Sequence, residues 1–244
     1  MRLRVGLIGA LVAAAVALGY GVNAGWTHTA DVFAAHDLMP WRACPYHPQS
    51  SVDQLIAPLP AAFCHSPQPL YAPPATGRVA FAVASTAAPA MAMVAVAILA
   101  CLAPRRRRLR TLIVGLAALG AASVGEVVGK LAVTRPPILR LTHAHQVAVS
   151  MTHSFPCGHT IRGCIVVYLV IALRRSWAAA AFVWFAAVQV ALVSTSGHTL
   201  TDLGGGLLLG LVIAAVMARA LRHTPEPARV SAPSALPAAG ETVV

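Results

Sequence analysis

Residues 111–133 read TLIVGLAALGAASVGEVVGKLAV, a run of 23 residues in which Glu126 and Lys130 are the only charged side chains. A helix rises about 1.5 Å per residue, so about 20 apolar residues cross a bilayer core of about 30 Å. We therefore predict that this segment is a membrane-spanning helix.

The composition of the whole chain agrees with this prediction. Apolar residues make up 58% of the 244 residues and charged residues only 10%, whereas a soluble domain carries about 25% charged residues. An ordinary water-soluble globule is therefore excluded. Five further apolar windows occur, and we predict an all-α, six-helix bundle that is integral to a membrane. The six windows are Val5–Gly25, Val79–Ala103, Thr111–Val133, His159–Leu173, Ala178–Ser194 and Leu203–Met217.

The basic residues divide unequally between the two sides of the predicted bundle. Lys and Arg outnumber Asp and Glu by 18 to 7, and this net charge of +11 would suggest nucleic-acid binding in a soluble protein. Here the arginines stand at the ends of apolar windows, as the positive-inside rule expects of cytosolic loops. With the N-terminus in the cytosol, twelve basic residues are cytosolic and six are outside. We therefore predict a multi-pass protein of the cell membrane, with both termini cytosolic and no nucleic-acid partner.

These boundaries divide the chain into four regions. They are a first transmembrane helix or signal anchor (1–25), an extracytoplasmic loop (26–77), a transmembrane core (78–222) and a Pro/Ala/Ser-rich tail (223–244). The tail lacks apolar periodicity, so we expect it to be disordered in the cytosol.

The first window has a second interpretation. Met1–Arg4 is basic and Val22–Ala24 resembles a small-residue cleavage site, so the segment could be a secretory signal peptide. We favour the uncleaved helix, because the apolar stretch continues towards Trp26. Either interpretation places the next loop outside, where Cys44 and Cys64 are expected to form a disulfide; two unpaired thiols are the alternative.

Ionisable side chains gather at the predicted outer ends of three windows. Lys130 ends the third window with Arg135 just beyond it, His159 opens the fourth, and His198 and Asp202 enter the sixth. A charged group at such a depth is costly and needs a partner or a function. The convergence of these groups at one membrane face predicts a functional site.

The spacing of these residues favours phosphate chemistry. His198 and Asp202 are four residues apart, so on a helix the carboxylate can orient the imidazole and leave its other nitrogen as a nucleophile or base. His159 stands in a first helical turn behind Gly158, where backbone N–H groups and the helix dipole favour an anion. Lys130 and Arg135 supply cationic donors for phosphate oxygens.

In their order along the chain, these residues resemble the three signatures of the type 2 phosphatidic acid phosphatase (PAP2) superfamily, which includes haloperoxidases. The matching elements are Lys130 with Arg135-Pro136, then Pro156-Cys157-Gly158-His159, then His198-x3-Asp202. The resemblance implies a six-helix membrane fold of the PAP2 type and hydrolysis of lipid phosphates without a metal or other cofactor. It also implies that His198 is the nucleophile, that Asp202 orients it, that His159 protonates the leaving alkoxide and that Lys130 binds phosphate.

The chain departs from the family signatures, which read K-x6-R-P, P-S-G-H and S-R-x5-H-x3-D. Pro137-Ile138 replaces Arg-Pro, Cys157 replaces serine, and Ala191-Leu192 replaces Ser-Arg. Arg135 keeps the first arginine of an extended form of the first signature, and Arg162 and Arg140 are further substitutes. We expect phosphate to be bound by Lys130, Arg135, Cys157, Gly158 and Arg162.

We therefore predict a lipid-phosphate phosphatase, active on a monoester or diphosphate at the outer face through a phosphohistidine intermediate. The alternative is a noncatalytic protein of the same fold; haloperoxidase chemistry is disfavoured because it needs the full arginine set. Lys130 could instead be neutralised by Glu126, one helical turn earlier. A Cys157 nucleophile is disfavoured because Arg162 is one residue too close for a cysteine-phosphatase loop. No metal is expected, since the loop histidines His143, His145 and His153 lack an accompanying Cys or carboxylate.

Overall fold

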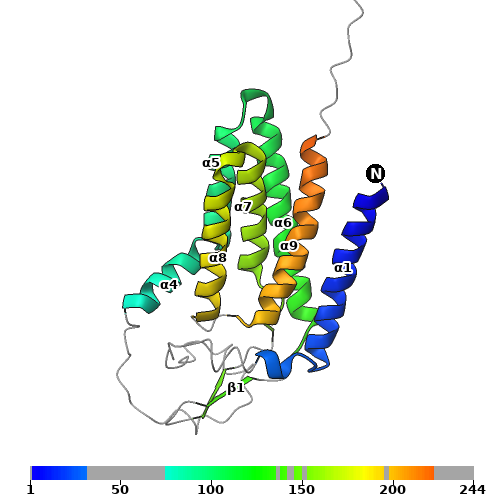
Figure 1. Ribbon diagram of the computed structural model, residues 1–244, viewed down its shortest axis with the longest axis vertical. Coiled ribbons are helices and arrows are strands. Elements are labelled where there is room, and N and C mark those ends of the chain that lie inside the picture. Colours follow the sequence, from blue (N-terminus) through cyan, green and yellow to red (C-terminus); the bar gives the residue numbers. More distant parts are fainter. Residues whose placement is uncertain are drawn as a thin grey trace, which may run out of the picture.

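The computed structural model describes residues 2–31, 75–135, 138–141, 146–149, 153–194 and 198–222. Helices dominate these residues (Figure 1). They are α1 (Arg2–Asn23), α4 (Ala75–Ser85), α5 (Pro89–Leu102), α6 (Arg108–Ala132), α7 (Gly158–Leu173), α8 (Ala178–Ser194) and α9 (Leu200–Arg222), with 3-10 turns η2 (Arg105–Arg107) and η3 (Arg175–Trp177). Two short strands, β1 (Ile138–Leu141) and β2 (Gln146–Val149), complete the described elements.

Every apolar window of the sequence overlaps helix in the structure. Within the described part of the chain, four helices are long and apolar enough to cross a membrane: α1, α6 with η2, α8 with η3, and α9. The pair α4 and α5 makes a fifth if it is counted as one bent span. Helix α7 has only 16 residues, about 24 Å of rise. These helices make the chain a multi-pass membrane protein.

The second window is not one straight helix. Helices α4 and α5 meet at a bend of 58°. Pro89 occupies the start of α5, and Ala88 before it is extended (φ −63°, ψ 157°). Proline disfavours helical backbone in the preceding residue, so the break falls where the sequence places Pro89. As a result α4 leans away from the other helices and packs on α8 (Figure 1).

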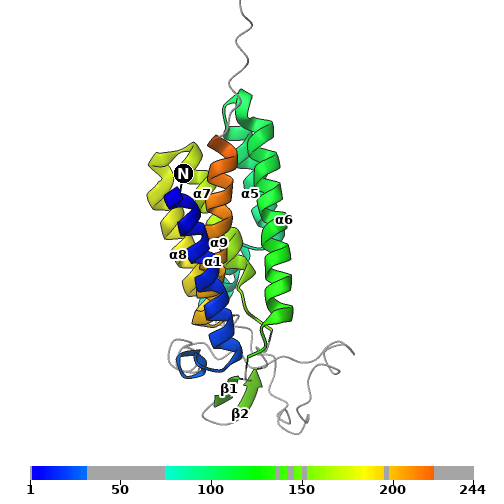
Figure 2. The ribbon, with the colours of Figure 1, turned by 90° about the vertical axis from the view of Figure 1, so that its right-hand side faces the viewer.

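Helix α7 is the centre of the bundle. It contacts α5, α6, α8 and α9, while α1 packs on the far side of α9 (Figures 1 and 2). Ile161, Ile165 and Leu169 of α7 are completely buried in the main apolar cluster. Large apolar side chains on the outer helices are instead exposed, for example Val16, Val128 and Val183. Such apolar outer faces are those expected of helices that lie against lipid.

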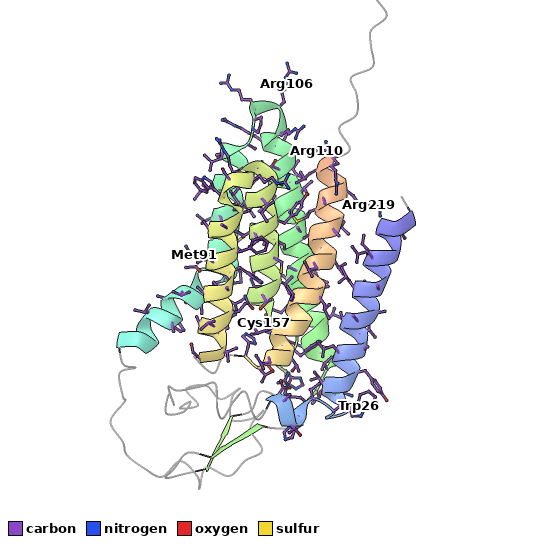
Figure 3. All side chains as sticks on the ribbon, viewed as in Figure 1. Trp26, Met91, Arg106, Arg110, Cys157 and Arg219 are labelled. Atoms are coloured by element: carbon purple, nitrogen blue, oxygen red, sulfur yellow. The ribbon has the colours of Figure 1, made fainter. Side chains whose placement is uncertain are left out.

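The two ends of the bundle differ in chemistry. Arg106, Arg110 and Arg219 lie at the end where α6 begins and α9 ends (Figure 3). Cys157 lies near the opposite end, where α7 and α9 begin, and Trp26 lies beyond the end of α1 at this same side (Figure 3). The arginine clusters and the candidate site therefore occupy opposite ends of the helices.

The all-α prediction is confirmed for the bundle, and a short hairpin between α6 and α7 is the one addition to it among the described residues. There β1 and β2 form an antiparallel hairpin, with Ile138 opposite Val149 and Leu141 opposite Gln146 (Figure 2). Each strand has only four residues, too few for a clear alternating pattern, although Ile and Val favour strands. Cys44, Cys64 and the 223–244 tail lie outside the described residues.

Candidate functional site

The site is built where the starts of α7 and α9 meet. The backbone N–H of Cys157, just before α7, donates a hydrogen bond to the backbone oxygen of Asp202 in α9 (2.9 Å). Gly206 allows this close approach, because a Cβ there would lie 2.6 Å from the backbone oxygen of Cys157. The two signature segments are thus joined through their backbones, which fixes the side chains that follow.

Three of the predicted site residues face one another at this junction. The sulfur of Cys157 and one ring nitrogen from each of His159 and His198 all lie within 4.8 Å of one another. The two imidazole rings have centroids 6.0 Å apart and meet edge to face. Cys157 is completely buried, whereas the His198 side chain is 13% exposed. The two histidines are therefore accessible from outside, with the thiol beneath them.

Asp202 lies behind His198 and is completely buried. Its Oδ2 is 3.5 Å from Nδ1 of His198 and accepts a hydrogen bond from the backbone N–H of Thr199 (3.0 Å). Its Oδ1 accepts a hydrogen bond from Arg135. The His198 Nδ1 atom has no hydrogen-bond partner among the described residues. The carboxylate therefore lies beside Nδ1 of the ring, so that Nε2 stays available for reaction.

Arg135 is engaged with the protein rather than free in the site. It is buried, and it donates hydrogen bonds to Thr199 (2.6 Å), to Thr201 (3.1 Å) and to Asp202. Its Nη1 is also 3.5 Å from Oδ2 of Asp31. This network ties the segment after α6 to the start of α9 and sets the position of Asp202.

Sequence reasoning did not single out Asp31, Thr199 and Thr201. Asp31 accepts hydrogen bonds from the hydroxyl and the backbone N–H of Thr201 and so connects the segment after α1 to α9. It is one of only seven acidic residues in the chain, and it follows the first apolar window at the predicted outer face. That placement is the signal that could have identified it.

The other two predicted phosphate ligands share one carboxylate. Glu126 of α6 accepts a hydrogen bond from Lys130 (2.6 Å) and another from Arg162 of α7 (2.7 Å). Arg162 is buried and also donates to the backbone oxygen of Ala87 (3.2 Å). The carboxylate lies against Gly158, where a Cβ would be 1.9 Å from Oε2 of Glu126. Gly158 therefore admits an anion to the first turn of α7, and in this structure that anion is Glu126.

Cys157 and His198 shift each other's protonation. Burial alone would raise the pKa of the Cys157 thiol, but hydrogen bonding to His159 and His198 outweighs burial and lowers that pKa to about 6. Burial alone would lower the pKa of His198, but Asp202 and Cys157 outweigh it and raise that pKa to about 9. The two directions are those of a thiolate beside an imidazolium.

Leu192 stands where the family signature has arginine. It is buried in an apolar cluster that includes Cys157, Val188 and Ala191. A longer, charged side chain at this position would therefore start within the cluster that contains Cys157. The departure from the signature replaces charge by apolar packing at the same place.

Comparisons with known proteins agree with this architecture. The family model of the PAP2 superfamily matches residues 113–224. The fold is similar to the crystal structure of the first transmembrane PAP2 type phosphatidylglycerolphosphate phosphatase from Bacillus subtilis, with a TM-score of 0.56 and 17% identity over 87% of this chain and 94% of that chain. No curated protein matches the chain. The family prediction made from the three signatures is thereby confirmed for the segment that carries them, which matches the PAP2 superfamily model.

Proposed function

We propose that the protein is a phosphatase that hydrolyses a phosphate monoester or diphosphate on a lipid at the extracytoplasmic face of the cell membrane. The observation that carries the proposal is the pair of accessible histidines, with ring centroids 6.0 Å apart and a buried carboxylate behind one of them. The match of residues 113–224 to the PAP2 superfamily model supports it, and the structural neighbour is itself named as a phosphatidylglycerolphosphate phosphatase.

The geometry supports a two-step reaction. Nε2 of His198, after passing its proton to the Cys157 thiolate, attacks phosphorus and forms a P–N bond while the bond from phosphorus to the lipid oxygen breaks. His159, as an imidazolium, gives its proton to the leaving alkoxide. Neutral His159 then takes a proton from water, whose oxygen attacks phosphorus and releases inorganic phosphate and His198. Asp202 orients His198 throughout and stabilises the charge that develops on its ring.

Phosphate requires cations, and those near the site have partners that a substrate must displace or share. Lys130, Arg135 and Arg162 each contact a carboxylate in the structure. Lys130 is the most accessible of them, with a side chain 36% exposed. We propose that the Lys130 ammonium turns from Glu126 to the phosphate. Cys157 and Gly158 place the start of α7 against the phosphate, and the buried Arg162 guanidinium adds positive charge beneath it.

Two features support a lipid as the substrate class. The site lies at the end of a bundle whose outer helices expose large apolar side chains. A mainly apolar pocket between α5 and α6 reaches Arg162 and is lined by Pro89, Met93, Leu116, Leu119, Gly120 and Ser123. Such a lipid would lie with its chains along these apolar faces and its phosphate at the histidines.

The proposal includes six crossings, with α4 and α5 together as the second and α7 as the fourth. Both termini are then cytosolic, and the site faces outwards. The segregation of Arg106, Arg110 and Arg219 from Cys157 supports this orientation, because arginines favour the cytosolic ends of spans (Figure 3). The regions 1–25, 26–77, 78–222 and 223–244 keep their proposed roles as first span, outer loop, core and cytosolic tail.

Phosphate release from purified protein tests the proposal. The substrates are phosphatidate, phosphatidylglycerol phosphate and a polyprenyl diphosphate in detergent micelles. The expected result is release by the native chain that His198→Ala abolishes and His28→Ala, a histidine outside the site, retains. Equal background release from native protein and His198→Ala on every substrate would overturn the proposal.

A noncatalytic PAP2-fold protein is the second candidate function. The observation that favours it is the pairing of Lys130, Arg135 and Arg162 with carboxylates, together with Leu192 in place of arginine. Such a protein would bind lipid phosphate without turnover. The release assay together with a measurement of lipid-phosphate binding separates the two, because binding without release in the native chain identifies the noncatalytic form.

A further inference from the structure

The three side chains at the junction of α7 and α9 are also those that bind transition metals. Cys157 offers a sulfur and His159 and His198 offer ring nitrogens, and these atoms lie within 4.8 Å of one another. The ligands come from two chain segments whose backbones are joined by the hydrogen bond from Cys157 to Asp202. The site is therefore held by the fold and does not depend on a loop closing around an ion.

We propose that Cys157, His159 and His198 bind a divalent transition-metal ion, Zn²⁺ above all, with a fourth position open to water or an anion. One thiolate and two imidazoles form a ligand set that zinc accepts. Zn–S bonds of about 2.3 Å and Zn–N bonds of about 2.0–2.1 Å place tetrahedral ligand atoms about 3.4–3.6 Å apart. The separations are at most 4.8 Å, so side-chain rotations would have to shorten the largest of them by about 1 Å to reach this geometry.

The Asp202 carboxylate behind His198 supports metal binding independently of the three ligands. The Nδ1 atom of His198 is buried, has no hydrogen-bond partner in the described residues, and lies 3.5 Å from Oδ2 of Asp202. A metal-binding histidine characteristically donates its second ring N–H to a carboxylate, which fixes the ring and raises its basicity. With Nε2 on the ion, His198 would make that hydrogen bond to Asp202.

The charges beneath the histidines also favour a cation. Arg135 contacts both Asp31 and Asp202, so this ion-paired group carries one net negative charge. A bound Zn²⁺ with a Cys157 thiolate adds one net positive charge above it. Binding of Zn²⁺ to Cys157 and His198 releases to solvent the one proton that this pair holds, and no electron is transferred.

Metal binding would compete with the phosphatase reaction. The proposed nucleophile and the proposed acid are both ligands, so the bound ion removes both from the reaction. This consequence rests on the proposed function, whereas the metal site itself does not. The serine of the family signature is a poorer ligand than a thiolate, so the inhibition would be specific to a chain with Cys157.

Cobalt absorption tests the site directly. The full chain in detergent, with Cys44, Cys64 and Cys101 replaced by serine, is titrated with Co²⁺, whose bond to a thiolate gives a charge-transfer band in the near ultraviolet. The expected result is a band that saturates at one Co²⁺ per chain and is lost when Zn²⁺ is added. No band at saturating Co²⁺, or a band unaffected by Zn²⁺, would overturn the proposal.

Two variants in this background locate the ligand. Cys157→Ser should remove the band and weaken binding by at least about 100-fold, since losing a partner outside the ligand shell already costs about 10–100-fold. Cys164→Ser is the matched control, because Cys164 is buried in α7 against Gly210, and it should leave the band intact. A band that survives Cys157→Ser, or disappears with Cys164→Ser, contradicts the assignment.

His159→Ala supplies a second test if Cys157→Ser fails to fold, as judged by circular dichroism and gel filtration. It should weaken Co²⁺ binding and shift the visible cobalt bands, while unchanged affinity would exclude His159 as a ligand. Zn²⁺ inhibition of phosphate release, measured with native protein and Cys157→Ser, is scored separately. A chain that binds Co²⁺ through Cys157 but releases no phosphate keeps the metal site and rejects only the proposed function.

Discussion

Glu126 is expected to contribute strongly to the stability of the site region. It bridges Lys130 and Arg162, whose side chains are 36% and 4% exposed. Glu126→Gln removes the anion from both, but only Arg162 is left buried without an opposite charge. Breaking a buried pair in this way costs about 3–5 kcal/mol, and we expect about 3 kcal/mol because glutamine and Ala87 still accept hydrogen bonds from Arg162.

Lys130→Met is the matched comparison for this change. It removes the exposed partner and leaves Glu126 paired with Arg162, so the expected cost is about 1 kcal/mol or less. The double variant Glu126→Gln/Arg162→Met replaces the buried cation by an apolar side chain and should recover most of the lost stability, since such replacements are often neutral.

Equilibrium unfolding in mixed micelles, with increasing sodium dodecyl sulfate and tryptophan fluorescence as the signal, measures these differences. The account expects Glu126→Gln to be the least stable of the three variants and the double variant to be near the native chain. Equal costs for Glu126→Gln and Lys130→Met would refute the reasoning. A double variant as unstable as Glu126→Gln alone would refute it too.

Three further outcomes follow from the same structure. Asp202→Asn should lower phosphate release by roughly 10³–10⁴-fold in the lipid assay, because the ring of the nucleophile loses its orienting charge; near-native release would remove that role. Gly205→Ala should cost about 1–3 kcal/mol in the unfolding assay, because a Cβ at this position would lie 2.2 Å from the buried Phe155 ring. Gly120→Ala is the control and should cost nothing, because a Cβ there would have no atom within 4 Å. Equal effects of the two changes would contradict the packing. A reporter inserted near Gln54 should be extracytoplasmic and one fused after α9 cytosolic, and the reverse at either point would overturn the orientation of the site.

The apolar windows could be read from the sequence because a membrane imposes length and hydropathy on each span separately. The window Ala178–Ser194 coincides with α8, and His159–Leu173 differs from α7 by one residue. These features are local, so no tertiary information is needed to find them. The break at Pro89 is local as well and the proline marks it, but the length and hydropathy of the window do not report the 58° bend.

Part of the site could also be predicted from spacing. The four-residue interval places His198 and Asp202 side by side, with 3.5 Å between Nδ1 and Oδ2. The meeting of His159 with His198 followed only from the alternation of spans across the membrane. Both arguments depend on helix geometry, which the sequence specifies well.

The partners of the cations could not be predicted in the same way. Arg135 contacts Asp31 and Arg162 contacts Glu126 across long stretches of chain, and such pairs depend on how the helices pack. The Cys157 thiol between two histidines is a further contact of this kind. It arises because the starts of α7 and α9 are joined, which no local pattern reports.

The covalent intermediate is the most direct test of the central claim, that His198 transfers phosphate. Native protein is mixed with lipid phosphate, quenched in alkali within one turnover, digested and mapped by mass spectrometry. The account predicts phosphate on the peptide that contains His198 in the native protein, and no phosphate on that peptide in His198→Ala. Phosphate on Cys157, or turnover with no phosphorylated His198 at any quench time, would contradict it.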